Sequence, residues 1–349
     1  MEDLTRLIDR LETDQVLNRE DFIRLIREHT PDTDEYLFQK ADRLRQQSYG
    51  NEIYIRGLIE LTNYCKNDCL YCGIRRSNRS AQRYRLDQED IMECCRTGYE
   101  LGFRTFVLQG GEDGWYTDEK VCRILTSIKH DYPDCAVTLS LGERSRKTYQ
   151  AWFEAGADRY LLRHETATPE HYAKLHPPEL SLAHRMECLR DLKEIGYQTG
   201  CGFMVGSPFQ TTEHLAEDLL YIHKLQPQMV GIGPFIPHHD TPFAKEPAGT
   251  VNDTLFFLAI IRLMLPKVLL PATTALGTID PNGREKGVHA GANVIMPNLS
   301  PLSVRKKYML YDNKISTGEE AAESIDSLRK RMAAIGCQVI VGRGDYKKY

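Results

Sequence analysis

Stretches rich in apolar and β-branched residues alternate, along most of this chain, with stretches that have the spacing of amphipathic helices. Strands are expected at 53–61, 105–109, 136–141, 159–164, 198–205, 229–235, 269–275 and 292–297. Helices are expected between them at 87–101, 118–130, 145–155, 182–195, 212–225, 252–265 and 282–290. This succession predicts an α/β protein, and it favours a complete (β/α)8 TIM barrel over an open doubly wound sheet.

Helical segments are expected on both sides of the barrel. Residues 1–50 read as an N-terminal helical extension, in which Asn18 and Thr33 are candidate N-caps. The barrel then spans 51–307, and a C-terminal tail, 308–349, carries one more helix at 319–335 and packs on the barrel.

The composition is that of an ordinary soluble protein, with 41% hydrophobic residues, 27% charged residues and a net charge of −4. Such a balance argues against a large nucleic-acid substrate, because binding to phosphates needs a basic surface. The chain has no apolar run long enough to span a bilayer, and its N-terminus lacks the core of a signal peptide. We therefore expect a cytoplasmic protein with no membrane partner.

Three of the ten cysteines, Cys65, Cys69 and Cys72, follow the first strand with the spacing C-x-x-x-C-x-x-C. Ten cysteines in a chain of 349 residues do not suggest a disulfide framework, and only these three have the spacing of metal ligands. Three thiolates in one loop suit a four-iron, four-sulfur cluster and leave its fourth iron without a protein ligand. A structural zinc site is the alternative, but it normally needs four protein ligands and no partner for the three follows nearby.

Other polar residues stand where the next strands end, and the carboxyl ends of barrel strands meet at one mouth. Gln109 is the last residue of the second strand and is followed by Gly110, Gly111 and Glu112, and the glycines permit a close approach of the backbone to a ligand. The third predicted strand contributes Thr138 and Ser140 and is followed by Glu143.

The fourth strand ends in Arg163, His164 and Glu165. Arg163 can hold an anion by bidentate hydrogen bonds, and Glu165 can accept hydrogen bonds from a ribose or an amino group. Arg185 on the following helix is either a ligand of a carboxylate or one half of a buried ion pair that braces the mouth.

The later strands offer weaker candidates. His238, His239 and Asp240 have the chemistry of a metal site, although a polar loop stiffened by proline is the favoured interpretation. Thr273 and Thr274, at the end of the seventh strand, point to opposite sides of it and suit a polar or anionic ligand. Tyr308 and Tyr311 are expected on one face of a helix, where they either cap the cavity or pack.

The cysteine spacing, with Tyr71 before the last cysteine, resembles that of the radical S-adenosylmethionine (SAM) enzymes, and Gly110-Gly111-Glu112 resembles their GGE element. More specifically, the sequence between about residues 50 and 312 is similar to the HydE branch, which matures FeFe-hydrogenases. The similarity rests on the runs at 108–113, 138–143, 159–166, 229–242, 271–278 and 291–298. Biotin synthase and methylornithine synthase are related barrels.

This resemblance implies a cluster that passes an electron to SAM and releases a 5′-deoxyadenosyl radical. The implied substrate is a cysteine-bound iron carbonyl cyanide complex, whose sulfur the radical attacks. The implied partners are the maturases HydG and HydF and an external electron donor. Implied cofactor-binding residues are Tyr71, Gln109, Gly110, Gly111, Glu112, Ser140, Arg163, Glu165, Arg185, Met229 and Tyr308. Implied substrate- or anion-binding residues are Arg56, Thr138, Thr273, Thr274 and Tyr311.

One departure from some members concerns a second cluster near the C-terminus. The only cysteine after Cys201 is Cys337, so we expect no second cysteine-ligated cluster there. Cys135 and Cys201 are too few for the sulfur-donating cluster of biotin synthase. Two alternatives stay open: a radical SAM mutase or sulfur-insertion enzyme of the methylornithine synthase and biotin synthase branch, and a non-catalytic iron–sulfur or zinc protein.

Overall fold

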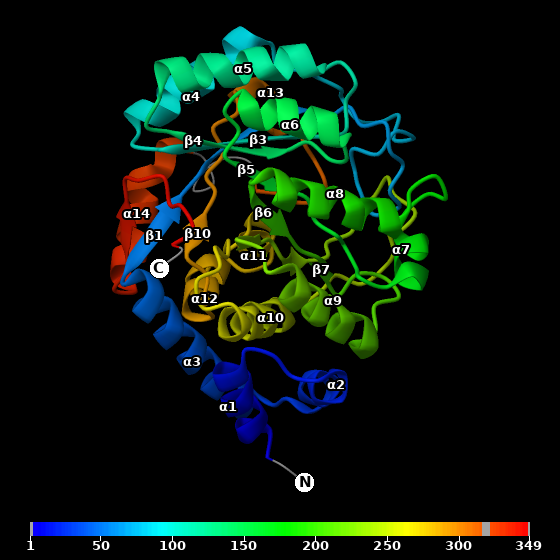
Figure 1. Cartoon of the computed structure of the whole chain (residues 1–349), viewed down its shortest axis with the longest axis vertical. Helices are drawn as coiled ribbons and strands as arrows, with labels where there is room; N and C mark the ends of the chain where they lie inside the picture. The colour runs from blue at the N-terminus through cyan, green and yellow to red at the C-terminus, as the bar shows by residue number, and fades with distance from the viewer. Residues whose placement is uncertain (1–2, 316–321, 348–349) are drawn as a thin grey trace.

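A parallel sheet surrounded by helices forms the centre of the computed structural model, which describes residues 3–315 and 322–347 (Figure 1). Each strand of the largest sheet pairs with the next along the chain, as expected for successive strand–helix units. The order is β2 (Gly57–Thr62), β3 (Thr105–Gly110), β4 (Ala136–Ser140), β5 (Arg159–Leu161), β6 (Gln198–Cys201) and β8 (Met229–Val230).

A second parallel sheet joins distant parts of the chain. Its central strand, β1 (Glu52–Ile55), pairs with β10 (Val294–Ile295) on one side and β11 (Gln338–Ile340) on the other. Isolated parallel bridges connect Met229 to Leu269, Pro271 to Val294 and Leu58 to Asn298. A short pair, β7 (Met204–Val205) and β9 (Gly233–Pro234), lies beside the main sheet.

Helices follow the strands, and most of them begin at a residue whose side chain caps the helix. Asp87 caps the first of them, because its side chain accepts a hydrogen bond from the Asp90 N–H, and Ser145 and Thr250 act in the same way further along the chain. The helices are α4 (Gln88–Glu100), α5 (Asp118–Asp131), α6 (Arg146–Glu154), α8 (Leu182–Ile195), α9 (Thr212–Leu225), α10 (Val251–Met264) and α12 (Gly283–His289).

The N-terminal extension covers α10. It consists of α1 (Leu4–Asp14), α2 (Arg19–Glu28) and α3 (Pro31–Tyr49), and α1 and α3 both pack on α10 (Figure 1). Eleven of the fourteen residues of α10 are buried, as expected for a helix that is apolar on all sides. Within the described ranges, no helix is long and apolar enough to cross a bilayer.

One predicted cap in this extension is confirmed and one is wrong. Asn18 caps α2 by accepting from the Asp21 N–H. The cap of α3 is Thr30 and not Thr33, because Pro31 supplies the first helical position, where a missing N–H costs nothing.

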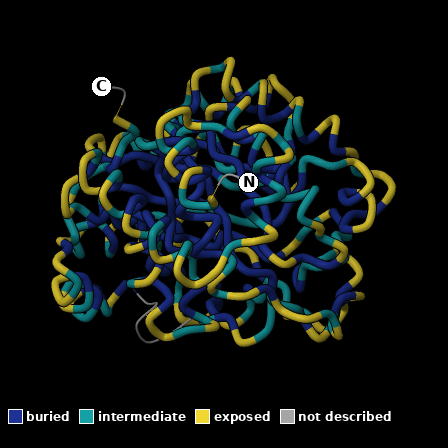
Figure 2. The backbone as a smooth tube through the Cα atoms, turned by 90° about the horizontal axis from the view of Figure 1, so that it is seen from below, coloured by how far each residue is buried: buried dark blue, intermediate teal, exposed yellow. Residues whose placement is uncertain are grey.

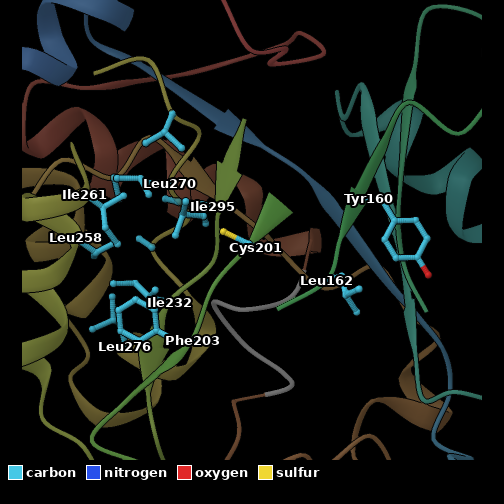
Figure 3. Close-up of a cluster of buried hydrophobic side chains, with 14 of the residues drawn as sticks. Tyr160, Leu162, Cys201, Phe203, Ile232, Leu258, Ile261, Leu270, Leu276 and Ile295 are labelled. Atoms are coloured by element: carbon cyan, nitrogen blue, oxygen red, sulfur yellow. The ribbon is translucent and has the colours of Figure 1, made fainter. Parts of the chain in front are cut away.

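The core lies between the sheet and the helices, and the exposed residues are mostly in the outer loops and helix faces (Figure 2). Figure 3 shows Ile295 of β10 and two residues next to short strands, Phe203 and Ile232, in one cluster with Leu258 of α10 and Leu276. All five are fully buried, so the strands and helices share one continuous core.

Residues near the C-terminus pack against the amino ends of several strands, opposite the carboxyl ends that carry the cysteine loop. Arg159, which is fully buried, donates to the Asp345 carboxylate at 2.5 Å and to the Arg343 carbonyl oxygen at 2.8 Å. The Thr105 hydroxyl donates to that same carbonyl oxygen at 2.8 Å. Together with β11, these contacts form a latch, residues 338–345, across the amino ends of β1, β3 and β5.

The seventh predicted strand, 269–275, is wrong over most of its length. Only Leu269 and Pro271 form single bridges, and a helix, α11 (Thr274–Ile279), starts directly after Thr273. Thr273 is the N-cap of this helix, so two β-branched residues that suggest a strand instead mark a helix start.

Three other predicted strands are interrupted. The expected strand 53–61 divides at Arg56 into β1 and β2, which belong to different sheets. The expected strands 198–205 and 229–235 each break into two short pieces, the first of them at Gly202, whose φ of 153° leaves the ordinary strand conformation. Helix α7 (Pro169–Leu175) and strand β11 were not predicted, because short elements carry little periodic signal.

The tail differs from prediction in one more respect. The expected helical face for Tyr308 and Tyr311 is wrong, since α13 (Leu302–Arg305) ends before both and neither lies in a helix. Of the predicted helix 319–335, residues 319–321 lie outside the described residues, a 3-10 turn covers Ala322–Ser324, and α14 spans Ile325–Ala334.

Candidate cofactor site at the strand ends

The cysteine loop starts where β2 ends, and all three of its cysteines are free and partly exposed. The backbone N–H of Glu112 donates to the Cys65 sulfur at 3.4 Å, and the Lys66 N–H donates to the Glu112 carbonyl oxygen at 2.9 Å. The loops that follow β2 and β3 are therefore joined at the first cysteine, as the barrel topology predicts.

The three thiols suit a metal centre better than they suit the protein alone. Burial raises the pKa of Cys65, Cys69 and Cys72, and the neighbouring cysteines raise that of Cys69 and Cys72 further. A cationic centre that binds all three as thiolates would offset this cost. The donor set therefore fits an iron–sulfur cluster, whose preferred protein ligands are thiolates.

Gly111 allows the loop after β3 to lie directly against the cysteine loop. A Cβ atom at this position would lie 2.2 Å from the Tyr64 carbonyl oxygen and 2.8 Å from the Cys65 Cβ. At Gly142, which has a φ of 76°, a Cβ would lie 2.0 Å from the Glu112 Cγ. Only glycine fits either position, and at Gly111 the reason is the close approach of the two backbones.

The Glu112 side chain connects three strand ends. Its Oε1 accepts from the Glu143 N–H at 2.8 Å, after β4, and its Oε2 lies 3.2 Å from the Lys66 ammonium in the cysteine loop. Glu112 is only 5% exposed, so this carboxylate fixes the loops around the site.

Arg185, on α8, forms a buried ion pair with Glu143 and donates to the Arg163 carbonyl oxygen at 2.7 Å. In this structure the Arg185 guanidinium is thus paired with the Glu143 carboxylate. Arg163 and Glu165 point toward one another, with Nη2 and Oε2 3.2 Å apart. The Arg163 Nε has no hydrogen-bond partner among the described residues.

Glu165 has left-handed backbone geometry, with a φ of 65°, which is uncommon for a residue with a side chain. Its neighbours hold it there. The His164 Nδ1 accepts from the Gly202 N–H at 3.3 Å, and the His164 Nε2 lies 3.3 Å from the Asp218 carboxylate. Asp218 also accepts from the Ala167 N–H at 2.5 Å.

Asp218 and His164 are fully buried, and burial raises the pKa of the Asp218 carboxyl. Asp218, on α9, was missed in the sequence because it lies 53 residues beyond Glu165 on a helix with no motif. It thus connects α9 to the turn that presents Arg163 and Glu165.

His176 is a second residue that the sequence did not reveal. Its Nδ1–H donates to the Tyr172 carbonyl oxygen at 3.0 Å, so its Nε2 can accept from the Tyr71 hydroxyl at 3.3 Å. Burial lowers the pKa of His176 to about 3, so the ring is neutral at neutral pH. It fixes the aromatic ring next to Cys72.

Gln109 and Tyr308 meet above the end of β3, where the Gln109 amide lies 3.4 Å from the Tyr308 hydroxyl. Ser140 is the neighbour of Gln109 in the register of β3 and β4. Tyr308 is 2% exposed, and its carbonyl oxygen accepts from Lys314, whose ammonium also pairs with buried Glu60. Tyr311 is partly exposed.

Hydrogen-bond donors without acceptors lie deeper in the sheet. Arg56 is 5% exposed, and its only hydrogen-bond acceptor in the described part of the chain is the Met229 sulfur, at 3.0 Å. Burial and the nearby Arg159 lower its pKa. The Thr138 and Thr273 hydroxyls also have no hydrogen-bond partner there. The next residue, Thr274, accepts a hydrogen bond from the Thr278 hydroxyl at its backbone carbonyl oxygen. These donors can receive a buried anion.

His238, His239 and Asp312 place their possible ligand atoms within 4.8 Å of one another. However, the His238 Nδ1 accepts from the Asp240 N–H at 3.1 Å, so the proton of the neutral ring is on the Nε2 that faces Asp312. That nitrogen has no lone pair for a metal. A Cβ at Gly73 would lie 2.3 Å from the His238 Cδ2, so this ring packs on the end of the cysteine loop.

Known proteins have sequences similar to that of this chain. A profile of the radical SAM superfamily matches residues 59–222. The [FeFe] hydrogenase maturase subunit HydE of Thermotoga maritima is 48% identical over 302 residues, which cover 86% of each chain. The 3-methylornithine synthase of Methanosarcina acetivorans is 29% identical over 97% of this chain and 94% of its own.

Solved structures share the fold. The crystal structure of methylornithine synthase (PylB) superposes with a TM-score of 0.84 and 26% identity, and the match covers 95% of this chain and 97% of the other. The hydrogenase maturase HydG has a TM-score of 0.80 at 19% identity and covers 96% of this chain and 75% of its own, which shows a common fold.

Proposed function

The chain belongs to the radical SAM superfamily and, within it, to the HydE family, and from this premise we propose that it matures the di-iron subcluster of FeFe-hydrogenase. The family resemblance expected from the sequence is confirmed, and the chain is a radical SAM enzyme whose family implies a four-iron, four-sulfur cluster and SAM. The 48% identity over 86% of both chains is the observation that carries the maturase assignment.

In this proposal Cys65, Cys69 and Cys72 hold three irons and leave the fourth open to SAM. When bound, the cluster supplies the electron that cleaves SAM into methionine and a 5′-deoxyadenosyl radical. The backbone at Gly110–Gly111 binds the amino group of the methionine part of SAM. The side chains proposed to surround the cofactor are Tyr71, Gln109, Glu112, Ser140, Arg163, Glu165, Arg185, Met229 and Tyr308.

The proposed substrate is a cysteine-bound iron carbonyl cyanide complex, attacked at its sulfur. An anionic complex of this kind would satisfy the unpartnered donors of Arg56, Thr138 and Thr273. Leaving each such group buried without a partner costs about 1–3 kcal/mol, which supports a ligand in this position. Thr274 and Tyr311 complete the proposed substrate residues. HydG is the proposed supplier, HydF the proposed recipient, and an external donor the source of electrons.

The proposal also covers the closure of the barrel, the division of the chain into domains and the location of the protein. We infer that the strands close into a complete (β/α)8 barrel, which the isolated bridges at Leu269, Pro271 and Asn298 support. Residues 1–50, 51–307 and 308–349 are the proposed extension, barrel and tail. No second cysteine-ligated cluster is proposed, and the protein is proposed to act in the cytoplasm without nucleic acid or membrane.

The test is anaerobic reconstitution with iron and sulfide, followed by reduction in the presence of SAM and measurement of 5′-deoxyadenosine. We expect deoxyadenosine, and we expect it to rise when the cysteine-bound iron complex is added. Formation of methylornithine from lysine would instead favour the second candidate, which the 29% identity over 97% of the chain supports. No deoxyadenosine above background would favour a non-catalytic iron–sulfur or zinc protein.

A further inference from the structure

Two exposed aromatic side chains lie beside the cysteine loop. Tyr64, 37% exposed, immediately precedes Cys65, and Trp115, 39% exposed, lies in the loop between β3 and α5. The Arg85 guanidinium lies between them, with its carbon 3.9 Å from the centre of the Tyr64 ring and 5.7 Å from that of Trp115. The guanidinium donates two hydrogen bonds to the Asp113 carboxylate, of 2.6 and 3.0 Å, which hold it in place.

Cations extend this surface along α5. The Lys120 ammonium lies 3.4 Å from the centre of the Trp115 ring, and Arg123 follows one turn later. These three residues also line a hollow of about 130 Å³. We call the set Tyr64, Lys66, Arg85, Trp115, Lys120 and Arg123 the aromatic–basic surface.

The charge around the cysteine loop opposes that of the whole chain. Residues 64–85 contain six basic residues and one acidic residue, Asp68, whereas the chain has a net charge of −4. Arg79 is exposed, and Arg83 donates to four backbone carbonyl oxygens rather than to a carboxylate. Three of the four cations of the aromatic–basic surface have carboxylate partners: Lys66 pairs with Glu112, Arg85 with Asp113 and Arg123 with Glu119. Glu112 and Asp113 are buried behind the surface, whereas the three cationic side chains are partly or largely exposed, and the exposed Arg123 pair neutralises little.

We infer that the aromatic–basic surface docks a small acidic iron–sulfur carrier protein of the ferredoxin class. This inference rests on the proposed function, which needs one electron per SAM cleaved from outside the chain. The reduced carrier gives up one electron and leaves oxidised, and the cluster on the three cysteines gains it.

Three observations select this surface. Tyr, Trp and Arg are the residues that most often dominate the binding energy of protein interfaces. A basic surface on an acidic chain steers an acidic partner toward one face. Lys66 directly follows Cys65, and consecutive Cα atoms are about 3.8 Å apart, so a partner on this surface lies next to the cluster ligands.

The test compares two electron sources for 5′-deoxyadenosine formation by the reconstituted enzyme: a reduced acidic ferredoxin and titanium(III) citrate. In the double variant Lys120→Glu/Arg123→Glu we expect the ferredoxin-driven rate to fall roughly tenfold or more and its dependence on salt to weaken. The rate with titanium(III) should not change. Trp115→Ala should raise the KM for ferredoxin and leave the titanium-driven rate intact.

The matched control is Arg329→Glu/Lys330→Glu on α14, which changes the charge by the same amount on two partly or fully exposed positions. Its ferredoxin-driven rate should equal that of the wild type. Equal losses in both double variants, a loss with titanium(III) as well, or a wild type that ferredoxin cannot reduce would each overturn the docking surface. A wild type inactive with titanium(III) would instead overturn the proposed function.

Discussion

The first five strands of the main sheet and the later segment 269–298 build the same fold in different ways. Strands β2 to β6 pair through successive parallel ladders, with one register shift between Glu60 and Thr62 of β2, and charged residues near their ends form ion pairs, as Glu143 does with Arg185. The later segment pairs mostly through isolated bridges, and its Thr273 hydroxyl has no hydrogen-bond partner among the described residues.

This difference suggests that the regular half serves the cofactor and the irregular half serves the substrate. In the regular half, Glu112, Glu143 and Arg185 hold the cysteine loop and the Gly-Gly turn together through hydrogen bonds and an ion pair, although Thr138 and Arg163 have atoms without partners among the described residues. The irregular half retains unused hydrogen-bonding capacity in a buried place, which is where a polar ligand gains most. We therefore expect changes in the first half to abolish cofactor chemistry and changes near the second to affect the substrate.

The largest effect is expected from Cys69→Ala in the regular half. With two thiolates left, the cluster is not retained, and SAM-dependent deoxyadenosine formation should be abolished while the barrel remains folded. Iron content, deoxyadenosine and circular dichroism measure this, with Cys122→Ala on α5 as the control. A Cys69→Ala protein that lost its helical signal would contradict the division of tasks.

Gly111→Ala should have the next largest effect. The new methyl group would lie 2.2 Å from the Tyr64 carbonyl oxygen, so the cysteine loop must move. We expect destabilisation by about 1–3 kcal/mol and a corresponding loss of bound iron. Gly114→Ala is the control, because nothing lies within 4 Å of a Cβ there. Urea unfolding and iron analysis of both variants decide whether the close approach matters.

Arg56→Met tests a buried donor that contacts the later segment, because the Arg56 backbone N–H donates to the Ile295 carbonyl oxygen. Removing a buried cation that has no carboxylate partner should stabilise the protein by about 1–3 kcal/mol, because the desolvation cost disappears. Conversion of the iron complex should fall roughly tenfold or more, the equivalent of about 1.4 kcal/mol of lost binding. Thermal unfolding and turnover are measured together; a destabilised variant with normal turnover would break the comparison.

The smallest effect concerns pH. Because the pKa of His176 is lowered to about 3 in the folded protein and is near 6.5 when unfolded, the unfolded state takes up the proton first as pH falls. The contribution to stability is thus full above pH 6.5 and declines between pH 6.5 and 3. In His176→Gln the unfolding free energy should depend less on pH between pH 7 and 5. An unchanged slope of unfolding free energy against pH would show that His176 does not titrate in this way.

Sequence patterns predicted the regular half better than the irregular half. The cysteine loop, the Gly-Gly turn and strands β3 and β4 follow from alternation and from motifs, which are local signals. Helix α11 was missed because Thr273 and Thr274 favour strands by local propensity, while the fold uses the first as a cap.

Long-range partners escaped the sequence altogether. The contact of His176 with Tyr71 joins residues 105 positions apart, and no local pattern announces it. The ion pair of Arg185 with Glu143 was one of two interpretations of Arg185, and only the fold brings these two side chains together. Residues at strand ends are thus predictable as a group, but their individual partners depend on packing.

The latch at residues 338–345 has a consequence for synthesis of the protein. Arg159 and Thr105 are made long before Arg343 and Asp345, which satisfy them. While the chain is still emerging from the ribosome, the buried guanidinium therefore lacks its carboxylate, and β1 lacks one of its two neighbours. A nascent chain halted before residue 338 would be open to proteases at its base, although every cysteine of the cofactor loop had already been made.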